Sequence, residues 1–177
     1  MTQTTTMPLP GQPAPALDLD LIIDAKWRLA DQSPKAFTMI VFYRGLHCPI
    51  CGDYLAGLHD LYDDFLAKGV EVINVSMDSK DKAVEAQAKW NLDPIPMGYG
   101  LTEEQARAWG LYMSKARSDA DPDVFSEPGL AMVKPGGTLN MMEMGSAPYL
   151  RPDLKLLLSK LDFVIDKDFP PRGAYGG

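Results

Sequence analysis

The sequence predicts an α/β protein with a central mixed β-sheet flanked by helices and an N-terminal β-hairpin extension. Three observations lead to this prediction. Phe37–Tyr43 is apolar on both faces, as expected of a central strand that helices cover on either side. A long amphipathic segment and a second apolar run, Val70–Ser76, follow it, which indicates a strand–helix–strand unit. Two later apolar runs joined through Pro135-Gly136-Gly137 indicate an antiparallel hairpin.

The N-terminal segment precedes the central strand and predicts an arm and a hairpin. Residues 1–16 are rich in Thr and Pro, and we expect an extended arm. Leu17–Ile22 alternates apolar and polar side chains with period two, which is typical of a half-buried strand. Lys26–Ala30 repeats this alternation after Asp24, so the two segments are expected to pair.

The segment after the central strand predicts a helix over Pro49–Lys68. Pro49 suits the first helical position, where its missing N–H costs nothing, and Gly69 suits the left-handed residue beyond the end. One face of this helix is apolar at helical spacing; it carries Leu55, Leu58, Tyr62, Phe65 and Leu66. The following strand, Val70–Ser76, is expected parallel to the central strand because such crossovers are right-handed.

Two further helices are predicted in the middle of the chain. One runs from about Lys80 to Trp90, with Asp78 or Ser79 as its N-cap. The other opens at Thr102–Gln105, which has the spacing of a capping box, and ends near Gly110.

The last part of the chain predicts a loop, a hairpin and a helix. Ser114–Ser126 is polar and is expected to form a surface loop. Leu130–Val133 and Thr138–Met142 are the hairpin strands, and Pro152 opens the final helix. Residues 170–177 are Pro- and Gly-rich and predict a tail. With no repeat or linker, residues 1–177 are expected to form a single domain.

The two cysteines of the chain, Cys48 and Cys51, lie where the central strand gives way to the helix. Free N–H groups and the helix dipole favour a thiolate there and lower its pKa. We expect Cys48 to be the more exposed thiol and to attack, with Cys51 more buried and resolving. Attack on a peroxide gives a sulfenic acid, and attack on a protein disulfide gives a mixed disulfide; both cycles end in a Cys48–Cys51 bond and need an external reductant. The alternative is a pair of buried, inert cysteines.

Two neighbouring side chains are candidate participants. His47 is predicted either to stabilise the thiolate or to be an exposed turn residue. Arg44 is predicted either to lower the thiol pKa or hold a peroxide oxygen, or to be a surface arginine at a strand end. A four-ligand metal site is not expected, because His59 lies about 12 Å along the helix from Cys51, too far for one tetrahedral site. A partial metal site of His47, Cys48 and Cys51 is a weaker alternative. No cofactor is predicted.

Composition and charge exclude several classes of function. The 177-residue chain has a net charge of -7, so nucleic acid is not an expected partner. It shows no secretory signal and no apolar run near the roughly 20 residues that span a bilayer, so no membrane association is expected. Two cysteines are too few for a disulfide framework, and closely spaced cysteines in a reducing compartment indicate redox or metal chemistry. We expect a cytoplasmic protein.

The predicted order of elements is the thioredoxin arrangement, in which a cis-proline loop faces the cysteines; Pro128, just before the third core strand, has that place. The segments Phe42–Cys51 (Phe-Tyr-Arg-Gly-x-x-Cys-Pro-x-Cys), Val72–Ser79 and Ser126–Leu130 resemble the alkyl hydroperoxide reductase/thiol-specific antioxidant family, particularly its peroxiredoxin-like members. The resemblance implies a thiol-dependent reductase of hydroperoxides that forms an intramolecular disulfide. It also implies a thioredoxin- or glutathione-type reductant and suggests a homodimer.

The sequence departs from peroxiredoxins proper at two positions. They carry Pro seven residues and Thr or Ser three residues before the peroxide-reacting cysteine. Those positions hold Arg44 and Cys48 if that cysteine is Cys51, and Val41 and Gly45 if it is Cys48. The missing hydroxyl favours protein disulfides as substrates, so a thioredoxin-like disulfide reductase is one alternative function. A non-catalytic redox sensor or binding module is another.

Overall fold

The computed structural model describes residues 7–176. Its strands are β1 Asp18–Leu21, β2 Lys26–Arg28, β3 Phe37–Phe42, β4 Val70–Val75, β5 Met97–Tyr99, β6 Met113–Lys115, β7 Val124–Ser126, β8 Gly129–Val133 and β9 Leu139–Met144. Its helices are α1 Pro49–Asp60, α2 Tyr62–Ala67, α3 Lys80–Trp90, α4 Glu103–Ala108 and α5 Leu154–Asp166, with a 3-10 turn at Leu29–Asp31. In this part of the chain no helix has both the length and the apolar character needed to cross a membrane.

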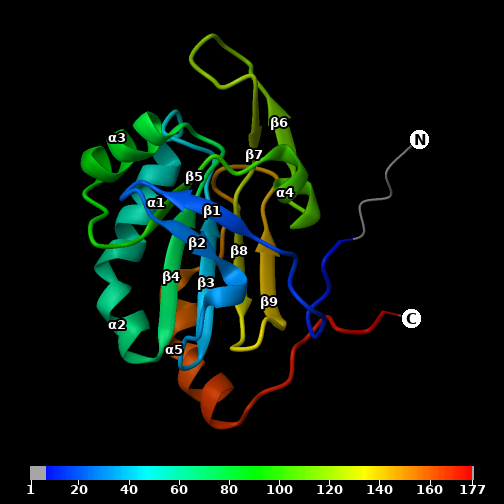
Figure 1. Ribbon diagram of the computed structural model, residues 1–177. Coiled ribbons are helices and arrows are strands. Elements are labelled where there is room, and N and C mark those ends of the chain that lie inside the picture. The colour runs from blue at the N-terminus through cyan, green and yellow to red at the C-terminus, as the bar shows by residue number, and fades with distance from the viewer. Residues whose placement is uncertain (1–6, 177) are drawn as a thin grey trace.

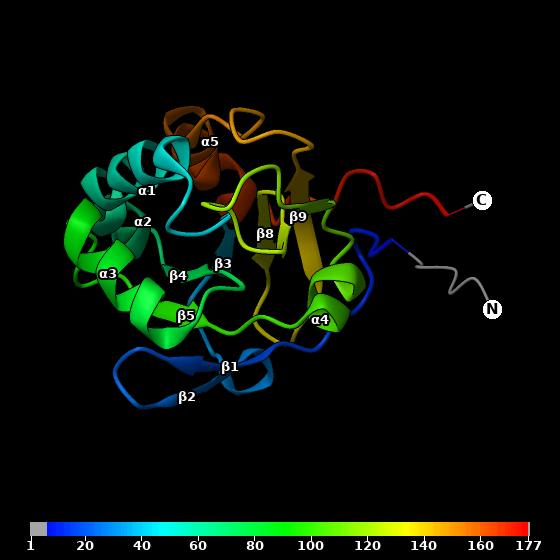
Figure 2. The same ribbon diagram turned by 90° about the horizontal axis from the view of Figure 1, so that it is seen from above.

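A seven-stranded mixed sheet in the order β2-β1-β5-β4-β3-β8-β9 forms the centre of the molecule. β3 is parallel to β4 and antiparallel to β8, and all of its residues are buried. Successive side chains of a strand point to opposite faces, so β3 contributes to two hydrophobic clusters. Met39 and Val41 face α1, α2 and α5, whereas Ile40 and Phe42 face the β1–β2 hairpin and α4. Figures 1 and 2 show these layers on either side of the sheet.

One end of this sheet gathers segments that are distant in sequence. Phe42 at the end of β3 pairs with Val75 at the end of β4 and with Gly129 at the start of β8. Gly129 in turn pairs with Met144 at the end of β9. The segments that follow β3, β4 and β9, and the segment that precedes β8, therefore meet at one end of the sheet. This end is the upper one in Figure 1.

Most of the predicted elements are confirmed. The N-terminal hairpin forms with Asp24 in a left-handed conformation at its turn, and β4 is parallel to β3. Thr102 and Gln105 form a capping box at the start of α4. The β8–β9 hairpin turns through residues 134–138. The final helix also forms, but it begins at Leu154 after the N-cap Asp153, so the expectation that Pro152 opens it is wrong.

The N-terminal arm is held by the edge strand β9. Residues 1–6 of the predicted arm, and Gly177 of the predicted tail, lie outside the described residues. Within the described part, the N–H of Gly11 donates to the carbonyl of Leu139 over 2.7 Å, and the N–H of Leu139 donates to Gln12 over 2.9 Å. The arm therefore covers the beginning of an otherwise open sheet edge.

Two predictions of secondary structure are wrong. The helix expected over Pro49–Lys68 is interrupted at Leu61, whose N–H bonds to Leu58 three residues back and tightens the turn. The apolar spacing continues across this point, so the sequence pattern does not show the break. The loop expected over Ser114–Ser126 begins and ends in the paired strands β6 and β7, which form a separate two-stranded ribbon.

Candidate active site

The two cysteines lie at the amino end of α1, as predicted. Cys48 is the N-cap residue, and its sulfur accepts the backbone N–H of Cys51 over 3.2 Å. The Cα atoms are 5.3 Å apart, and the sulfurs are at disulfide distance. Cys48 is 1% exposed and Cys51 is fully buried. The expected difference in exposure between the two thiols is therefore negligible, because both cysteines belong to the hydrophobic cluster beneath α1.

A partly buried arginine that the sequence analysis did not identify contacts one of the sulfurs. Nη2 of Arg151 donates to Sγ of Cys51 over 2.8 Å, and Nε donates to the carbonyl of Pro148 over 2.7 Å. The guanidinium lies 4.8 Å from the centroid of the Tyr54 ring. Burial lowers the pKa of Arg151 to about 10, so the side chain stays cationic at neutral pH. It places a positive charge where a thiolate at Cys51 would form.

Arg151 is 100 residues from Cys51 in sequence, in the segment between β9 and α5. Sequence spacing gives no sign of this contact. The topology could have indicated it. β8 is antiparallel to β3, and β9 is antiparallel to β8, so β9 ends beside the carboxyl end of β3. A charged residue just before the last helix is therefore placed near the cysteines.

Arg44 is buried beside a carboxylate instead of a sulfur. Its Nε lies 3.1 Å from Oε2 of Glu127, and the two side chains are 19% and 6% exposed. The other Glu127 oxygen accepts the hydroxyl of Ser114 over 2.7 Å, and the guanidinium lies 4.7 Å from the centroid of the Phe125 ring. Arg44 is not the surface arginine of the alternative interpretation. Its predicted roles toward the thiol and peroxide remain predictions.

His47 is half-buried and packs edge-on against Phe125, with the ring centroids 4.7 Å apart. Both ring nitrogens are buried and have no hydrogen-bond partner within residues 7–176. Burial, reinforced by the charge of Arg44, lowers the pKa of His47 below its usual value. This environment favours the neutral imidazole, and the predicted role of His47 beside a thiolate stays a prediction.

Of the two N-cap candidates for α3, Ser79 is the cap, and Asp78 instead holds the turn that leads to the cysteines. Oδ2 of Asp78 accepts the N–H of Leu46 over 2.8 Å. Gly45 in this turn has φ +132°, and a Cβ atom there would lie 2.7 Å from an Asp78 oxygen. Only glycine allows this backbone conformation and this approach. Burial raises the pKa of Asp78 above its usual value.

Pro128 is close to the site, but its peptide bond is not the expected isomer. The cis bond found among the described residues is Asp93–Pro94, so the expectation of a cis bond at Pro128 is wrong. X–Pro bonds are mostly trans in folded proteins, and sequence position alone does not fix the isomer. Pro128 lines a narrow hollow together with Tyr54 and Arg151, and its carbonyl accepts the N–H of Gly145 over 2.9 Å.

The other histidine does not join the cysteines. Nε2 of His59 lies 2.8 Å from the carbonyl oxygen of Asp93. Within the described chain, no three His, Cys, Asp or Glu side chains are grouped as a metal site.

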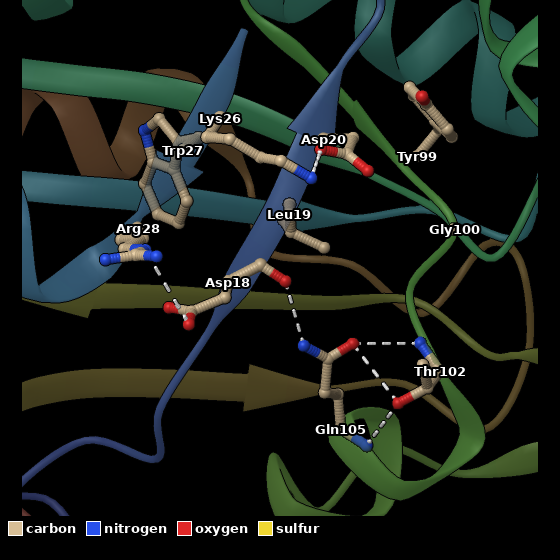
Figure 3. A pocket seen from close by; sticks show the side chains of 10 residues that line it. All are labelled: Asp18, Leu19, Asp20, Lys26, Trp27, Arg28, Tyr99, Gly100, Thr102 and Gln105. Carbon is tan, nitrogen blue, oxygen red and sulfur yellow. Dashed lines mark hydrogen bonds and ion pairs between the residues drawn. The ribbon is translucent and has the colours of Figure 1, made fainter.

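A larger hollow of about 360 Å³ lies at the β1–β2 hairpin, away from the cysteines. Figure 3 shows its charged side chains in pairs, Asp20 with Lys26 at 2.5 Å and Asp18 with Arg28 at 3.9 Å. Gln105 donates to the carbonyl of Asp18 over 3.0 Å. These charges are exposed and already neutralised by one another, so the hollow presents no set of unpaired groups for chemistry.

The fold and the buried cysteine pair define a thiol oxidoreductase of the thioredoxin-like class. A family model described as the AhpC/TSA family matches residues 10–142, and the chain belongs to this family. No curated protein matches. Family, fold and a cysteine pair at disulfide distance together support a peroxiredoxin-like thiol peroxidase with a Cys-x-x-Cys motif.

Solved peroxiredoxin structures share the fold at low sequence identity. The reduced 2-Cys peroxiredoxin of Plasmodium vivax is 15% identical, with 96% of this chain and 91% of that chain covered and a TM-score of 0.72. AhpC of Mycobacterium tuberculosis is 17% identical, covers 96% and 100%, and has a TM-score of 0.73. Reduced Prx3 of Vibrio vulnificus, solved with H2O2, is 18% identical, covers 88% and 99%, and has a TM-score of 0.73.

Proposed function

We propose that this protein reduces hydroperoxides with the Cys48–Cys51 dithiol and is itself oxidised to the intramolecular disulfide. A thiolate attacks the distal oxygen of ROOH; an S–O bond forms, the O–O bond breaks, and the leaving alkoxide takes a proton to become ROH. The second thiol attacks the sulfenic sulfur, which forms the S–S bond and releases water. An external reductant, one dithiol or two monothiol molecules, then returns two electrons and two protons.

The observation that carries the proposal is the contact between Arg151 and Cys51 at the amino end of a helix. A cationic donor 2.8 Å from the sulfur stabilises the thiolate more than the thiol. The amino end of α1 adds the positive end of the helix dipole. Both effects act in a buried site, where water screens them little.

The contacts favour Cys51 as the attacking thiol. The assignment of attack to Cys48, made from the sequence, depended on a difference in exposure, and both sulfurs are buried. Cys48 accepts a backbone N–H, whereas Cys51 accepts a charged guanidinium. Hydrogen bonds to charged groups are the stronger class. The reverse assignment, with Cys48 attacking and Cys51 resolving, is the alternative that the experiment below tests.

The roles of the two cysteines can be separated by trapping the sulfenic acid. Cys48→Ser and Cys51→Ser proteins are reduced, exposed to hydrogen peroxide and treated with dimedone, and the labelled residue is identified by mass spectrometry. We expect rapid labelling of Cys51 in Cys48→Ser and slow labelling of Cys48 in Cys51→Ser. Rapid labelling only in Cys51→Ser would assign the attack to Cys48. Absence of labelling in both would reject the peroxidase.

The physiological setting follows from the same chemistry. We propose a thioredoxin- or glutathione-type reductant and a homodimeric assembly, as the family resemblance suggested, and a cytoplasmic location, as the cysteine usage suggested. Protein disulfide reduction is the weaker alternative, because a bulky disulfide has no direct access to sulfurs that are 1% and 0% exposed. The non-catalytic sensor is excluded if the protein turns over with either type of reductant.

A further inference from the structure

A ribbon that is separate from the main sheet lies over the turn leading into the cysteines. β6 and β7 pair with each other, with Ser114 opposite Phe125, and neither strand joins the seven-stranded sheet. Figure 1 shows this ribbon beyond the end of the sheet where β3 and β4 finish, and Figure 2 looks down on it from that end. Residues 116–120 of its outer loop are exposed.

The base of the ribbon is fixed next to the site. The N–H of Glu127 donates to the carbonyl of Tyr112 over 2.7 Å, which closes the ribbon at its lower end. The Glu127 carboxylate accepts the Ser114 hydroxyl and pairs with Arg44 on the turn. The Arg44–Glu127 ion pair, which is largely buried, therefore connects the base of the ribbon to the turn before the cysteines.

Phe125 is the ribbon residue that packs into the site. Its ring is 2% exposed and contacts the guanidinium of Arg44 and the ring of His47, both at 4.7 Å between centres. Cation–aromatic and aromatic pairs of this kind stabilise the packed position of the ring. The ring thus fills the space beside the residues immediately before Cys48, and no chemical step of the dithiol requires it.

We propose that Phe125 limits the size of the molecules that reach the dithiol, so that small hydroperoxides react in preference to bulky aromatic ones. This inference rests on the proposed function for its peroxide substrates. Because both sulfurs are buried, any reagent must displace a neighbouring side chain. The ribbon has few backbone bonds to the rest of the chain, so its displacement disrupts less of the structure than opening the sheet or α1 would.

The size limit is tested first on the thiols themselves, without peroxide. Reduced wild type and Phe125→Ala are alkylated with N-ethylmaleimide and with a maleimide that carries a large aromatic dye. We expect Phe125→Ala to react about tenfold faster with the bulky reagent, while its rate with N-ethylmaleimide changes less than about threefold. An unchanged ratio of the two rates in a folded variant would overturn the proposal.

The second measurement compares kcat/KM for hydrogen peroxide and cumene hydroperoxide. Phe125→Ala is expected to shift the ratio toward cumene hydroperoxide by about tenfold. Phe125→Leu keeps much of the side-chain volume and should shift it less. Tyr112→Ala removes a half-exposed aromatic side chain at the base of the same ribbon and should leave the ratio unchanged.

Two further outcomes separate this inference from the proposed function. If Phe125→Ala does not fold, Ser114→Ala, which removes one hydrogen bond to Glu127, should shift the alkylation ratio in the same direction by a smaller factor. If wild type consumes neither peroxide while the alkylation ratio shifts in Phe125→Ala, the peroxidase is rejected and the size limit stands. If the alkylation ratio is unchanged in folded Phe125→Ala, or in Ser114→Ala where Phe125→Ala does not fold, the size limit is rejected.

Discussion

Two charged regions of this protein differ in almost every property that decides function. At the β1–β2 hairpin, Lys26 and Asp20 form an ion pair whose side chains are 78% and 43% exposed. Around the cysteines, Arg44 pairs with Glu127 with side chains that are only 19% and 6% exposed, and the partly buried Arg151 contacts Cys51. Exposed pairs gain little because water screens them, whereas buried charges act strongly on neighbouring groups. Charge at the buried end is therefore expected to control reactivity.

Replacing Arg151, the cationic side chain at Cys51, should change peroxidase activity more than the other substitutions described below. Arg151→Met keeps an apolar side chain over Tyr54 but loses the charged donor, and we expect kcat/KM for hydrogen peroxide at neutral pH to fall about 10- to 100-fold. When Arg151→Met is added to the Cys48→Ser protein, the rate of Cys51 alkylation should also fall at low pH, and it should recover at high pH. Arg172→Met, in the exposed tail, is the matched control and should behave as wild type. Equal activity of the two variants would contradict the role of Arg151.

A pair of glycine substitutions tests the turn that leads to the cysteines. Gly45→Ala should destabilise the protein by about 1–3 kcal/mol, because the added Cβ meets Asp78 at a backbone angle that other residues rarely adopt. Gly57→Ala, within α1 and with open space around its Cβ, should instead stabilise by about 0.5–1 kcal/mol. Urea denaturation measures both changes. A loss of stability in both variants, or in neither, would contradict the view that Asp78 holds the Gly45–Leu46 turn in a conformation that requires glycine.

The buried carboxyl of Asp78 should show its environment in the pH dependence of stability. Burial raises its pKa above the ordinary 3.8, so the folded state binds this proton more tightly than the unfolded state does. The contribution of Asp78 to the unfolding free energy therefore falls as pH rises from 3.8 through the raised pKa. Asp78→Asn removes this slope while keeping an acceptor for Leu46. Denaturation of both proteins across this pH range should show the variant gaining relative stability as pH rises, and the opposite trend would contradict this account.

The exposed pair should give the smallest effect. Lys26→Gln removes the charge opposite Asp20 at the hollow of Figure 3. Because both groups are solvated, we expect peroxide kinetics and the denaturation midpoint to match those of wild type. A loss of peroxidase activity in this variant would show that the hairpin region takes part in the reaction.

Much of the fold follows from local sequence patterns. The fully apolar run of β3, the glycine after the α1–α2 segment and the capping box at Thr102 each depend on neighbouring residues, and each is confirmed. The break at Leu61 and the pairing of β6 with β7 depend on tertiary packing and are absent from the pattern.

The candidate site is only partly accessible from sequence. The Cys-x-x-Cys motif can be recognised from sequence alone, because its two cysteines are three residues apart and lie in one helical turn. Arg151 and Glu127 lie near the site because the pairing of β3, β8 and β9 brings the ends of these strands together. Residues so far apart in sequence form no short motif that would identify them. Asp78 is a further example, since its sequence position equally suits a helix cap, and only the approach of Gly45 assigns it to the turn.

The central claim, that the two cysteines act together to reduce peroxide, is tested most directly by titrating the reduced wild-type protein with hydrogen peroxide. Remaining peroxide and free thiols are quantified, and peptide mapping locates the product. We predict that each molecule of peroxide consumed yields one Cys48–Cys51 disulfide and the loss of two thiols. Unconsumed peroxide with both thiols intact, or consumption without this disulfide, would contradict the account.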